Sequence, residues 1–136
     1  MNDLTKSLEE IIAALAADSG TIHMIGEDGA LHLKASSGVP EVVLNIVRIV
    51  PIGKGMAGLC AERAEPITAC NIQNDSSGNV RPGAKATGME GAIVVPIFDG
   101  QKLTGTLGIA NRQERTFTEE EQAQLIAAGR KMAHLS

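Results

Sequence analysis

Two Asp-Gly dipeptides, each between two runs of apolar residues, constrain the fold of this chain more than any other feature of its sequence. The first is Asp28-Gly29 and the second is Asp99-Gly100, and the flanking runs are residues 21–27, 30–36, 91–98 and 102–111. Asp28-Gly29 is a strong signal for a type I′ hairpin turn, and Asp99-Gly100 predicts a second hairpin. A tight hairpin makes its two strands antiparallel neighbours. The sequence therefore predicts an α+β fold with a mainly antiparallel sheet, rather than a doubly wound parallel one.

Helical periodicity occurs near both ends of the chain. Near the N-terminus, apolar residues recur on one helical face and predict a helix that ends at Ser19-Gly20; they are Leu4, Leu8, Ile11, Ile12 and Leu15. Residues 118–132 predict a second helix, in which Thr118 and Glu121 have the spacing of a capping box. We expect these two helices to pack on the sheet.

The pattern changes several times between the two hairpins. Residues 41–47 are apolar, but the run is too short for its periodicity to distinguish a helix from a strand. We expect a strand at residues 48–52, a short helix at residues 54–64 and another strand at residues 66–72. Residues 71–88 are polar and glycine-rich, which predicts a long loop, and long loops in compact domains usually have a function.

The composition limits the classes of ligand and partner. A chain of 136 residues predicts one domain, residues 1–136, with a single core. Hydrophobic residues make up 43% of it, but it has two Phe and no Tyr or Trp. The core must therefore be aliphatic, and stacking surfaces for bases, heme or bilins are scarce. The net charge of −4 argues against nucleic acid and anionic membranes as partners.

Neither a membrane segment nor an export signal is evident. No apolar run approaches the roughly 18 residues that span a bilayer, and the N-terminus does not resemble a signal peptide. Two cysteines, Cys60 and Cys70, fit a reducing cytoplasm better than a disulfide scaffold. No Cys/His pair has the spacing of metal ligands, and His23, His32 and His134 are not expected to bind heme or metal. We expect a cytoplasmic protein without a cofactor.

A glycine-rich segment, PIGKGMAG at residues 51–58, follows an apolar run and begins the predicted short helix. The spacing G-x-G-x-x-G occurs in dinucleotide-binding sites, which need a parallel strand after the helix and an acidic residue about 20 positions later. Here Glu65-Pro66 ends the helix early, and the following strand carries Asn71 instead of an acid. A P-loop is also excluded, because no Gly-Lys-Ser/Thr closes the segment.

Two interpretations of this segment remain open. In the first, its glycines serve only tight turning and close backbone packing. Alternatively, the backbone amides of Met56, Ala57 and Gly58 contact a ligand at the helix N-terminus, where the helix dipole favours an anion.

The most specific motifs lie in residues 91–122. Residues 92–97 read AIVVPI and residues 103–111 read LTGTLGIAN; Asn111-Arg112 is then followed by Phe117 and Glu121. These motifs resemble the GAF domain family, and the resemblance extends over nearly the whole chain, although Gln122 stands where the motif has Glu. It implies a central antiparallel sheet of about six strands with the terminal helices on one face. Short helices and loops would enclose a small-molecule pocket on the other face, with the glycine-rich segment in its wall.

The motif from Asn111 to Glu121 is interpreted as a structural clasp. Phe117 would pack as a hydrophobic staple at the start of the last helix. Arg112 would pair with Glu121 across the turn between strand and helix. Direct ligand contact by these residues is the less favoured alternative.

The resemblance implies several possible activities. Neither Cys60 nor Cys70 lies in a bilin attachment motif, so both are interpreted as small buried hydrophobes. Free methionine-(R)-sulfoxide reductases of this family carry cysteines where this chain has Ala57 and Lys85. Without those thiols the nucleophile and its partner are missing. We therefore expect no enzymatic activity, with the reductase kept as the alternative.

The remaining expectation is a sensory domain that binds a small anion, a carboxylate or a cyclic nucleotide. The loop RPGAK would supply a lid with two cations, Arg81 and Lys85, joined through Pro82 and Gly83; the alternative is solvated loop charge. Signalling would occur in trans, by resemblance to GAF proteins that act on a histidine kinase.

A ligand-free dimerisation or scaffold module is a further alternative. The first helix at residues 4–15 and the last at residues 125–135 carry Ala127, Ala128, Met132 and Ala133 among the residues that offer packing surface for a homodimer. The competing interpretation is that the same apolar residues cover the sheet.

Overall fold

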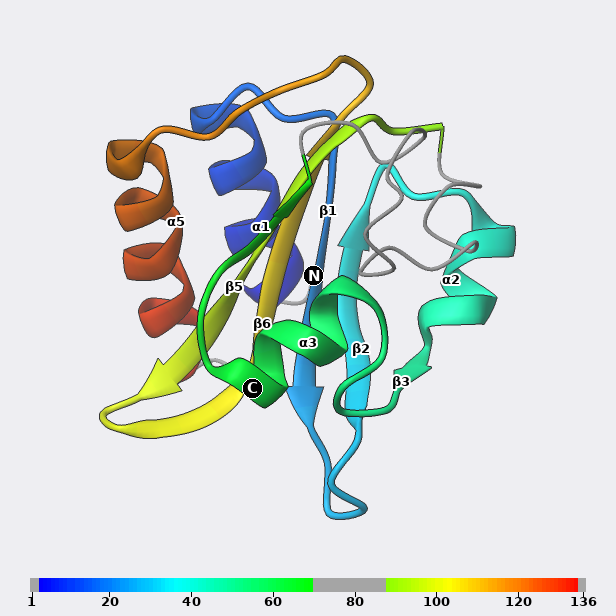
Figure 1. Ribbon diagram of the computed structural model, residues 1–136, viewed down its shortest axis with the longest axis vertical. Coiled ribbons are helices and arrows are strands. Elements are labelled where there is room, and N and C mark those ends of the chain that lie inside the picture. Colours follow the sequence, from blue (N-terminus) through cyan, green and yellow to red (C-terminus); the bar gives the residue numbers. More distant parts are fainter. Residues whose placement is uncertain (1–2, 70–87, 135–136) are drawn as a thin grey trace.

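The computed structural model of this chain describes residues 3–69 and 88–134. Its centre is a six-stranded sheet with the order β3-β2-β1-β6-β5-β4, in which every adjacent pair is antiparallel (Figure 1). The strands are β1 (Ser19–Ile25), β2 (Leu31–Ser37), β3 (Ile49–Val50), β4 (Ile67–Ala69), β5 (Gly91–Asp99) and β6 (Lys102–Asn111). The predicted α+β class and antiparallel sheet are confirmed.

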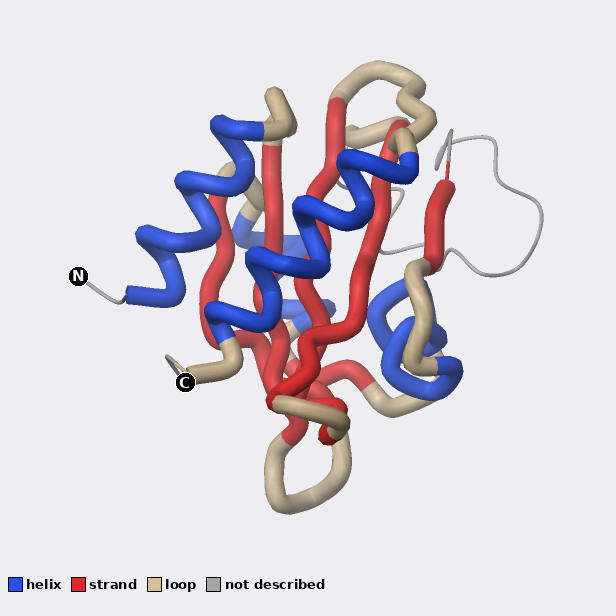
Figure 2. Tube along the Cα trace, turned by 90° about the vertical axis from the view of Figure 1, so that its left-hand side faces the viewer, coloured by secondary structure: helices blue, strands red, loops and turns tan. Residues whose placement is uncertain are grey.

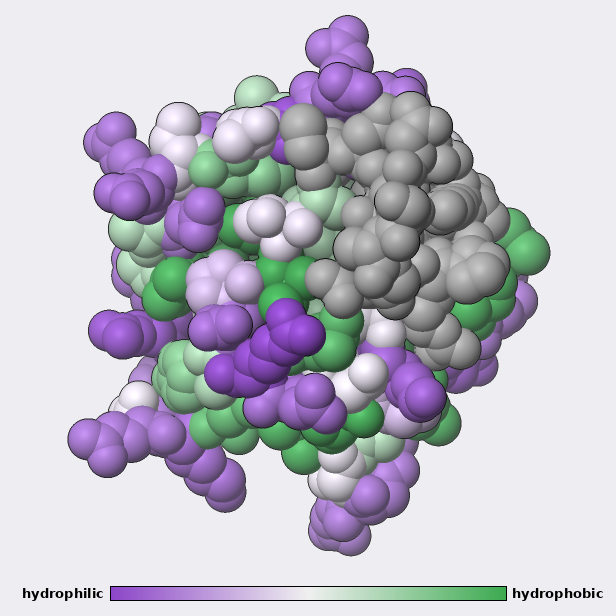
Figure 3. All heavy atoms as spheres, in the orientation of Figure 1, coloured by the Kyte–Doolittle hydropathy of each residue, from purple (hydrophilic) through white to green (hydrophobic). Residues whose placement is uncertain are grey.

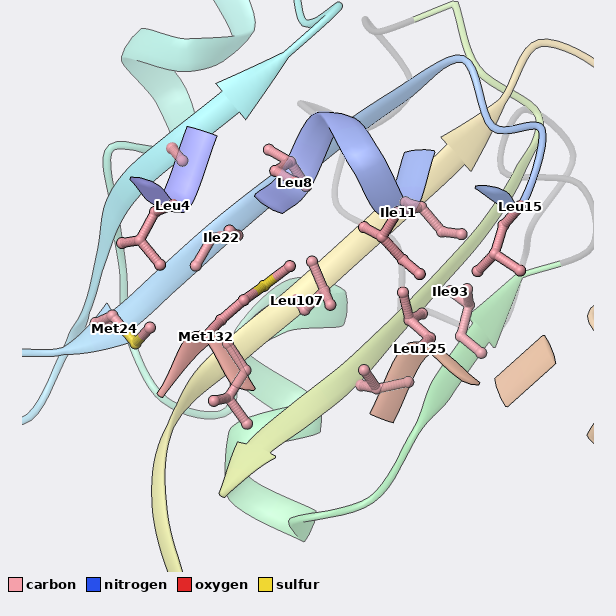
Figure 4. Packing of buried hydrophobic residues seen from close by; sticks show 14 of the residues in the cluster. Leu4, Leu8, Ile11, Leu15, Ile22, Met24, Ile93, Leu107, Leu125 and Met132 are labelled. Atoms are coloured by element: carbon pink, nitrogen blue, oxygen red, sulfur yellow. The ribbon is translucent and has the colours of Figure 1, made fainter. Parts of the chain in front are cut away.

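The two terminal helices cover one face of this sheet. Helices α1 (Asp3–Ala14) and α5 (Glu119–Met132) lie side by side across the strands (Figure 2). Their apolar stripes and the inward side chains of β1, β5 and β6 form the main core (Figure 4). Its buried members include Leu4, Leu8, Ile11, Ile22, Ile93, Leu107, Leu125 and Met132. The apolar residues considered for a dimer surface are thus largely used to cover the sheet.

Both predicted hairpins form, but the first does not have the type I′ turn predicted for Asp28-Gly29, which requires a positive φ at both central residues. At the first hairpin only Gly29 has a positive φ, of 80°, and the loop spans three residues because the Gly26 N–H donates to the Ala30 carbonyl at 2.9 Å. At the second, Asp99 remains in β5 opposite Lys102, and the turn consists of Gly100, with a φ of 64°, and Gln101. One left-handed residue per turn is enough, and glycine supplies it in each case.

The other face of the sheet carries two short helices, α2 (Glu41–Val47) and α3 (Gly55–Arg63). The ambiguous residues 41–47 are therefore helical, and the short helix predicted at residues 54–64 is confirmed. The strand predicted at residues 48–52 is reduced to the two residues of β3. Of the strand predicted at residues 66–72, β4 occupies Ile67–Ala69.

The loop predicted at residues 71–88 falls almost entirely outside the described residues, as does Cys70. Within the described ranges, no helix combines the length and the apolar character needed to cross a membrane.

Candidate functional site

A cavity of about 170 Å³ lies between the sheet and the two short helices, on the face opposite α1 and α5. Its lining comes from β1, β5 and β6, from α2 and α3, and from the segments that precede these helices. Most of the lining side chains described are aliphatic or thioether groups, among them Val43, Val47, Val50, Met56, Met89 and Val94. An apolar cavity of roughly 150 Å³ accommodates a benzene-sized molecule. This cavity therefore has room for a small, largely apolar ligand.

The first turn of α3 supplies backbone donors to the wall of the cavity. Lys54 is the N-cap residue and gives no side-chain cap to the helix. Gly55, Met56 and Ala57 follow it and line the cavity, and no hydrogen bond to their N–H groups occurs within the described residues. The first N–H groups of a helix have no partner within the helix and carry its positive dipole end. The turn can thus hold an anion.

The Lys54 ammonium adds a formal positive charge at this place. Its side chain is exposed, and among the described residues that line the cavity Lys54 is the one cationic residue, while none is an aspartate or a glutamate. The described lining therefore favours a negatively charged group over a positively charged one.

The expected ligand contacts need one correction. Met56 and Ala57 line the cavity as expected, and their contact with a ligand stays a prediction. Gly58 is buried and does not belong to the described lining. Its N–H donates to the Lys54 carbonyl at 3.1 Å, because Gly58 is the first residue of α3 with an acceptor four positions earlier. Its amide is therefore not available to a ligand.

The glycines of the segment at residues 51–58 allow the backbone to pack closely against α3. Gly53 has a φ of 89° and donates its N–H to the Gly58 carbonyl at 2.8 Å. A Cβ at Gly58 would lie 2.5 Å from the Pro51 carbonyl oxygen. The segment therefore folds tightly back on α3, which requires glycine at these positions. Since the described sheet contains no parallel pair, the dinucleotide interpretation loses its structural basis.

Three polar side chains in the cavity were not predicted as site residues. Ser19, Thr21 and His23 alternate along β1 and line the cavity, whereas Ile22 and Met24 belong to the core beneath α1 and α5. The period-two alternation of a strand places these two sets on opposite faces. The signal is present in the sequence as S-x-T-x-H, but the predicted strand begins only at residue 21, and His23 is considered there only as a ligand of heme or metal.

His23 joins β1 to α2. Its Nε2 lies 2.8 Å from the carbonyl oxygen of Val47, the last residue of α2. A carbonyl can only accept, so Nε2 carries the proton and donates it. Burial lowers the pKa of His23 below its usual value of 6.5, opposed by the hydrogen bond to Val47 and assisted by His32. The ring is therefore neutral near pH 7, with Nδ1 as a hydrogen-bond acceptor.

Cys60 lies in α3 and faces the sheet instead of the solvent. It has no exposed surface and packs in a cluster with Met56, Ile67, Met89 and Ala92. Burial, with a smaller effect of Glu65, raises the pKa of its thiol to about 12. Since the thiolate is the reactive form of cysteine, this side chain behaves as a small hydrophobe.

The cationic lid lies outside the described residues. This applies to Arg81, Pro82, Gly83 and Lys85, whose contact with a ligand stays a prediction. Within the residues that are described, no group of three His, Cys, Asp or Glu side chains could hold a metal ion.

The clasp between β6 and α5 forms with a different arginine. Glu121 pairs with Arg115, whose Nη2 lies 2.5 Å from Oε2, instead of with Arg112. Arg115 also donates to Asn111 Oδ1 at 2.8 Å. Arg112 directly follows the strand and is exposed, and its backbone N–H donates to Asp18 at 2.8 Å. The chain must turn after β6 before an arginine can reach Glu121, and Arg115 is the residue that follows this turn.

Phe117 is buried at the start of α5, as expected, within the main core. The guanidinium of Arg115 lies 4.5 Å from the centre of its ring. The predicted capping box between Thr118 and Glu121 is complete, with both hydrogen bonds present. These contacts hold the last helix and lie in the β6–α5 connection, and the interpretation of the motif as a purely structural clasp stays a prediction.

The comparisons with known proteins agree with this architecture. The sequence profile of the GAF domain matches residues 3–135. No curated protein sequence matches. A similar solved structure is the GAF domain of a phosphoenolpyruvate-protein phosphotransferase from Coxiella burnetii, with 26% identity, a TM-score of 0.79, and 97% of this chain and 79% of that chain covered. The corresponding Acinetobacter domain has 19% identity and a TM-score of 0.80, covering 97% and 78%.

A structure of a named enzyme is equally similar in fold. The type II free methionine-R-sulfoxide reductase from Thermoplasma acidophilum has 17% identity and a TM-score of 0.80, with 98% of this chain and 89% of that chain covered. At this identity the likeness concerns the fold alone.

Proposed function

This chain belongs to the GAF domain family, and we propose that it is a regulatory domain whose cavity binds a small carboxylate with an aliphatic body. The observation that carries the proposal is the first turn of α3. Its N–H groups at Gly55, Met56 and Ala57 lack partners within the described residues and line a cavity that is otherwise mainly aliphatic. A carboxylate would accept from these donors beside Lys54, and its hydrocarbon part would occupy the apolar space.

The expected energetics are those of a modest metabolite site. Burying each CH₂ group contributes about 0.8 kcal/mol, so a body of about four carbons contributes roughly 3 kcal/mol. A charge at a helix N-terminus adds about 0.3–1 kcal/mol when exposed and up to about 2 kcal/mol when partly buried. The apolar body therefore provides most of the affinity, and the carboxylate mainly determines the orientation.

The cavity volume and its lining favour a carboxylate over a cyclic nucleotide. A purine would need a stacking surface, and no aromatic side chain is found among the described lining residues. The volume of about 170 Å³ matches a ligand the size of benzene. Small inorganic anions would use the α3 donors and leave the apolar space without an occupant.

We also propose that the domain is not an enzyme. The position at which the related reductases carry a cysteine in the glycine-rich segment is Ala57, and it lines the cavity. Cys60 is fully buried, with its thiol pKa raised to about 12. The alternative, a methionine sulfoxide reductase, predicts thioredoxin-coupled reduction of free methionine-(R)-sulfoxide, and loss of that activity in Cys60→Ser or Cys70→Ser.

The output is proposed to occur in trans, through a partner such as a histidine kinase. Helix α2 supports this idea, because its two faces have different environments. Val43, Ile46 and Val47 line the cavity, whereas Val42 is outside the described lining; Val42 is 62% exposed and Ile46 is 46% exposed. Hydrophobic surface is visible at the right-hand edge in Figure 3, where Figure 1 places α2. A ligand that shifts α2 would therefore shift an exposed apolar surface.

The deciding experiment is a thermal shift measurement with four- to six-carbon monocarboxylates, with nitrate and a cyclic nucleotide as comparison ligands. A ligand at about 100 times its Kd should stabilise the protein by about 2.7 kcal/mol. Lys54→Gln should weaken carboxylate binding, whereas Lys102→Gln, an exposed lysine outside the described cavity lining, should not. If no carboxylate raises the melting temperature, the scaffold or homodimer module becomes the better hypothesis.

A further inference from the structure

We propose that the cavity selects carboxylates that carry a hydroxyl group, and that the residues which recognise the hydroxyl are Ser19, Thr21 and His23 on β1. This inference rests on the proposed function and specifies its ligand class. The carboxylate would lie at the first turn of α3, and the hydroxyl would lie at the polar row formed by the three side chains. The aliphatic part would contact the remaining, apolar walls.

The burial of the polar row is the first argument. Ser19 and His23 are only 4% and 3% exposed, yet both line the cavity together with Thr21. No hydrogen bond of the Ser19 or Thr21 hydroxyl occurs within the described residues. A ligand that displaces water from these hydroxyls without replacing its hydrogen bonds loses affinity. A ligand that supplies hydrogen bonds here avoids this loss, whereas an unsubstituted aliphatic chain does not.

The hydrogen-bonding state of His23 is the second argument, and it determines the polarity of the ligand group. Its Nε2–H is used by the Val47 carbonyl, so Nδ1 can only accept while the ring is neutral. Burial keeps the ring neutral near pH 7 by lowering its pKa, and His32 on β2 acts in the same direction. Opposite His23 on β6, Thr106 has a buried hydroxyl that also lacks a partner within the described residues. Because Nδ1 of the neutral ring accepts, a ligand group that binds it must be a hydrogen-bond donor.

The charge of the described lining decides between a hydroxyl and an ammonium, since both can donate. A buried ammonium requires a negatively charged partner. The described lining contains no aspartate or glutamate, and its one cationic residue is Lys54. An uncharged hydroxyl can donate to His23 and also accept from the serine and threonine hydroxyls. Hydroxycarboxylates are therefore expected to bind more tightly than amino acids with the same carbon skeleton.

Matched ligands test the selectivity by isothermal titration calorimetry. Butyrate, 3-hydroxybutyrate and 3-aminobutyrate form one set, and 2-hydroxy and 3-hydroxy derivatives of five-carbon carboxylates with their parent acids form the others. In at least one set the hydroxy member should bind about tenfold or more tightly than the parent acid, which corresponds to about 1.4 kcal/mol. Equal or tighter binding of the parent acids would overturn the hydroxyl selectivity while supporting the proposed function. Absence of binding by every carboxylate would overturn both.

Variants of the polar row test which residues are responsible. Ser19→Ala and Thr21→Val should reduce the hydroxyl preference, which is the ratio of the parent acid's Kd to that of the hydroxy member, by about threefold to tenfold. Thr68→Val, at the exposed position of β4, is the matched control and should leave this ratio unchanged. His23→Gln keeps a donor for Val47 and an acceptor for the ligand, so it should retain the preference. If Ser19→Ala and Thr21→Val both retain the full preference, the assignment is wrong.

A pH series adds a readout that a purely structural role would not affect. Protonation of His23 converts Nδ1 from an acceptor to a donor. As the pH falls through the pKa of His23, the ratio of the two Kd values, for the parent acid and the hydroxy member, should change, because the ligand hydroxyl then accepts from the protonated ring instead of donating to it. In His23→Gln the preference should not change with pH over the same range. A preference that is independent of pH in the wild-type protein would exclude His23 as the acceptor.

Discussion

At the scale of single residues, the backbone around Gly58 leaves no space for a side chain. A Cβ there would lie 2.5 Å from the Pro51 carbonyl oxygen and 3.1 Å from the Gly53 nitrogen, and both are backbone atoms that cannot rotate away. The glycine spacing that resembles a nucleotide fingerprint is thus explained by packing between the segment and α3. The same packing positions the first turn of α3 at the cavity.

We expect Gly58→Ala to lower the free energy of unfolding by about 2 kcal/mol, because the backbone must shift to admit the methyl group. The matched control is Gly129→Ala in α5, where the nearest atom to a Cβ is Ile97 Cγ1 at 3.3 Å, a side-chain atom. The gain in helix propensity offsets that contact, so the control should change stability by less than about 1 kcal/mol. Urea unfolding measures both. Equal effects of the two substitutions would contradict the packing explanation.

At the scale of elements, the connection between β6 and α5 depends on one arginine. Arg115 contacts Asn111, Phe117 and Glu121, and thereby links the end of the strand to the first turn of the helix. The pKa of Glu121 is lowered, first by its hydrogen bond from the Thr118 N–H and then by Arg115. Capping and ion pairing therefore converge on the same carboxylate.

Arg115→Met should lower the free energy of unfolding by about 1 kcal/mol, since it removes the ion pair and the hydrogen bond to Asn111. Arg112→Met removes an equal charge from an exposed position and should have less than about half of that effect. Chemical denaturation of the two variants under the same conditions distinguishes them. A larger loss in Arg112→Met would show that the wrong arginine has been assigned to the clasp.

At the scale of the whole molecule, the buried His23 makes global stability depend on pH. Its pKa in the folded protein lies below 6.5, because burial disfavours the charged ring. Above this value the ring is neutral in both states. As the pH falls, the unfolded chain takes up a proton that the folded protein resists, and stability is lost until the pH passes the folded pKa.

The wild-type protein should therefore lose stability between about pH 7.5 and pH 5, a range in which histidine is the main group that titrates. His23→Gln should show a smaller slope in this interval, because glutamine has no proton to gain. Denaturation curves at several pH values measure the slope. His134→Gln serves as the control, since His134 is exposed and is not among the groups that shift the pKa of His23. An unchanged slope in His23→Gln would exclude His23 as its cause.

Local signals in the sequence predicted much of this architecture. Asp-Gly dipeptides predicted the hairpins, period-3.6 stripes predicted α1 and α5, and the Thr118–Glu121 spacing predicted the capping box. Each of these depends on residues within a few positions of one another. Turn type and the partner of Glu121 were predicted wrongly, because both depend on the path of the backbone after the strand ends.

The sequence by itself determined the fold class and placed Met56 and Ala57 at the start of a helix, because propensity, capping and hydrophobic periodicity act locally. Only the tertiary structure decided what surrounds them. It places Ser19, Thr21 and His23 of β1 in the wall of the same cavity. It also uses the Gly58 N–H for a hydrogen bond to the Lys54 carbonyl at the start of α3. Cavities form where elements distant in sequence meet, and no local pattern specifies which faces will meet.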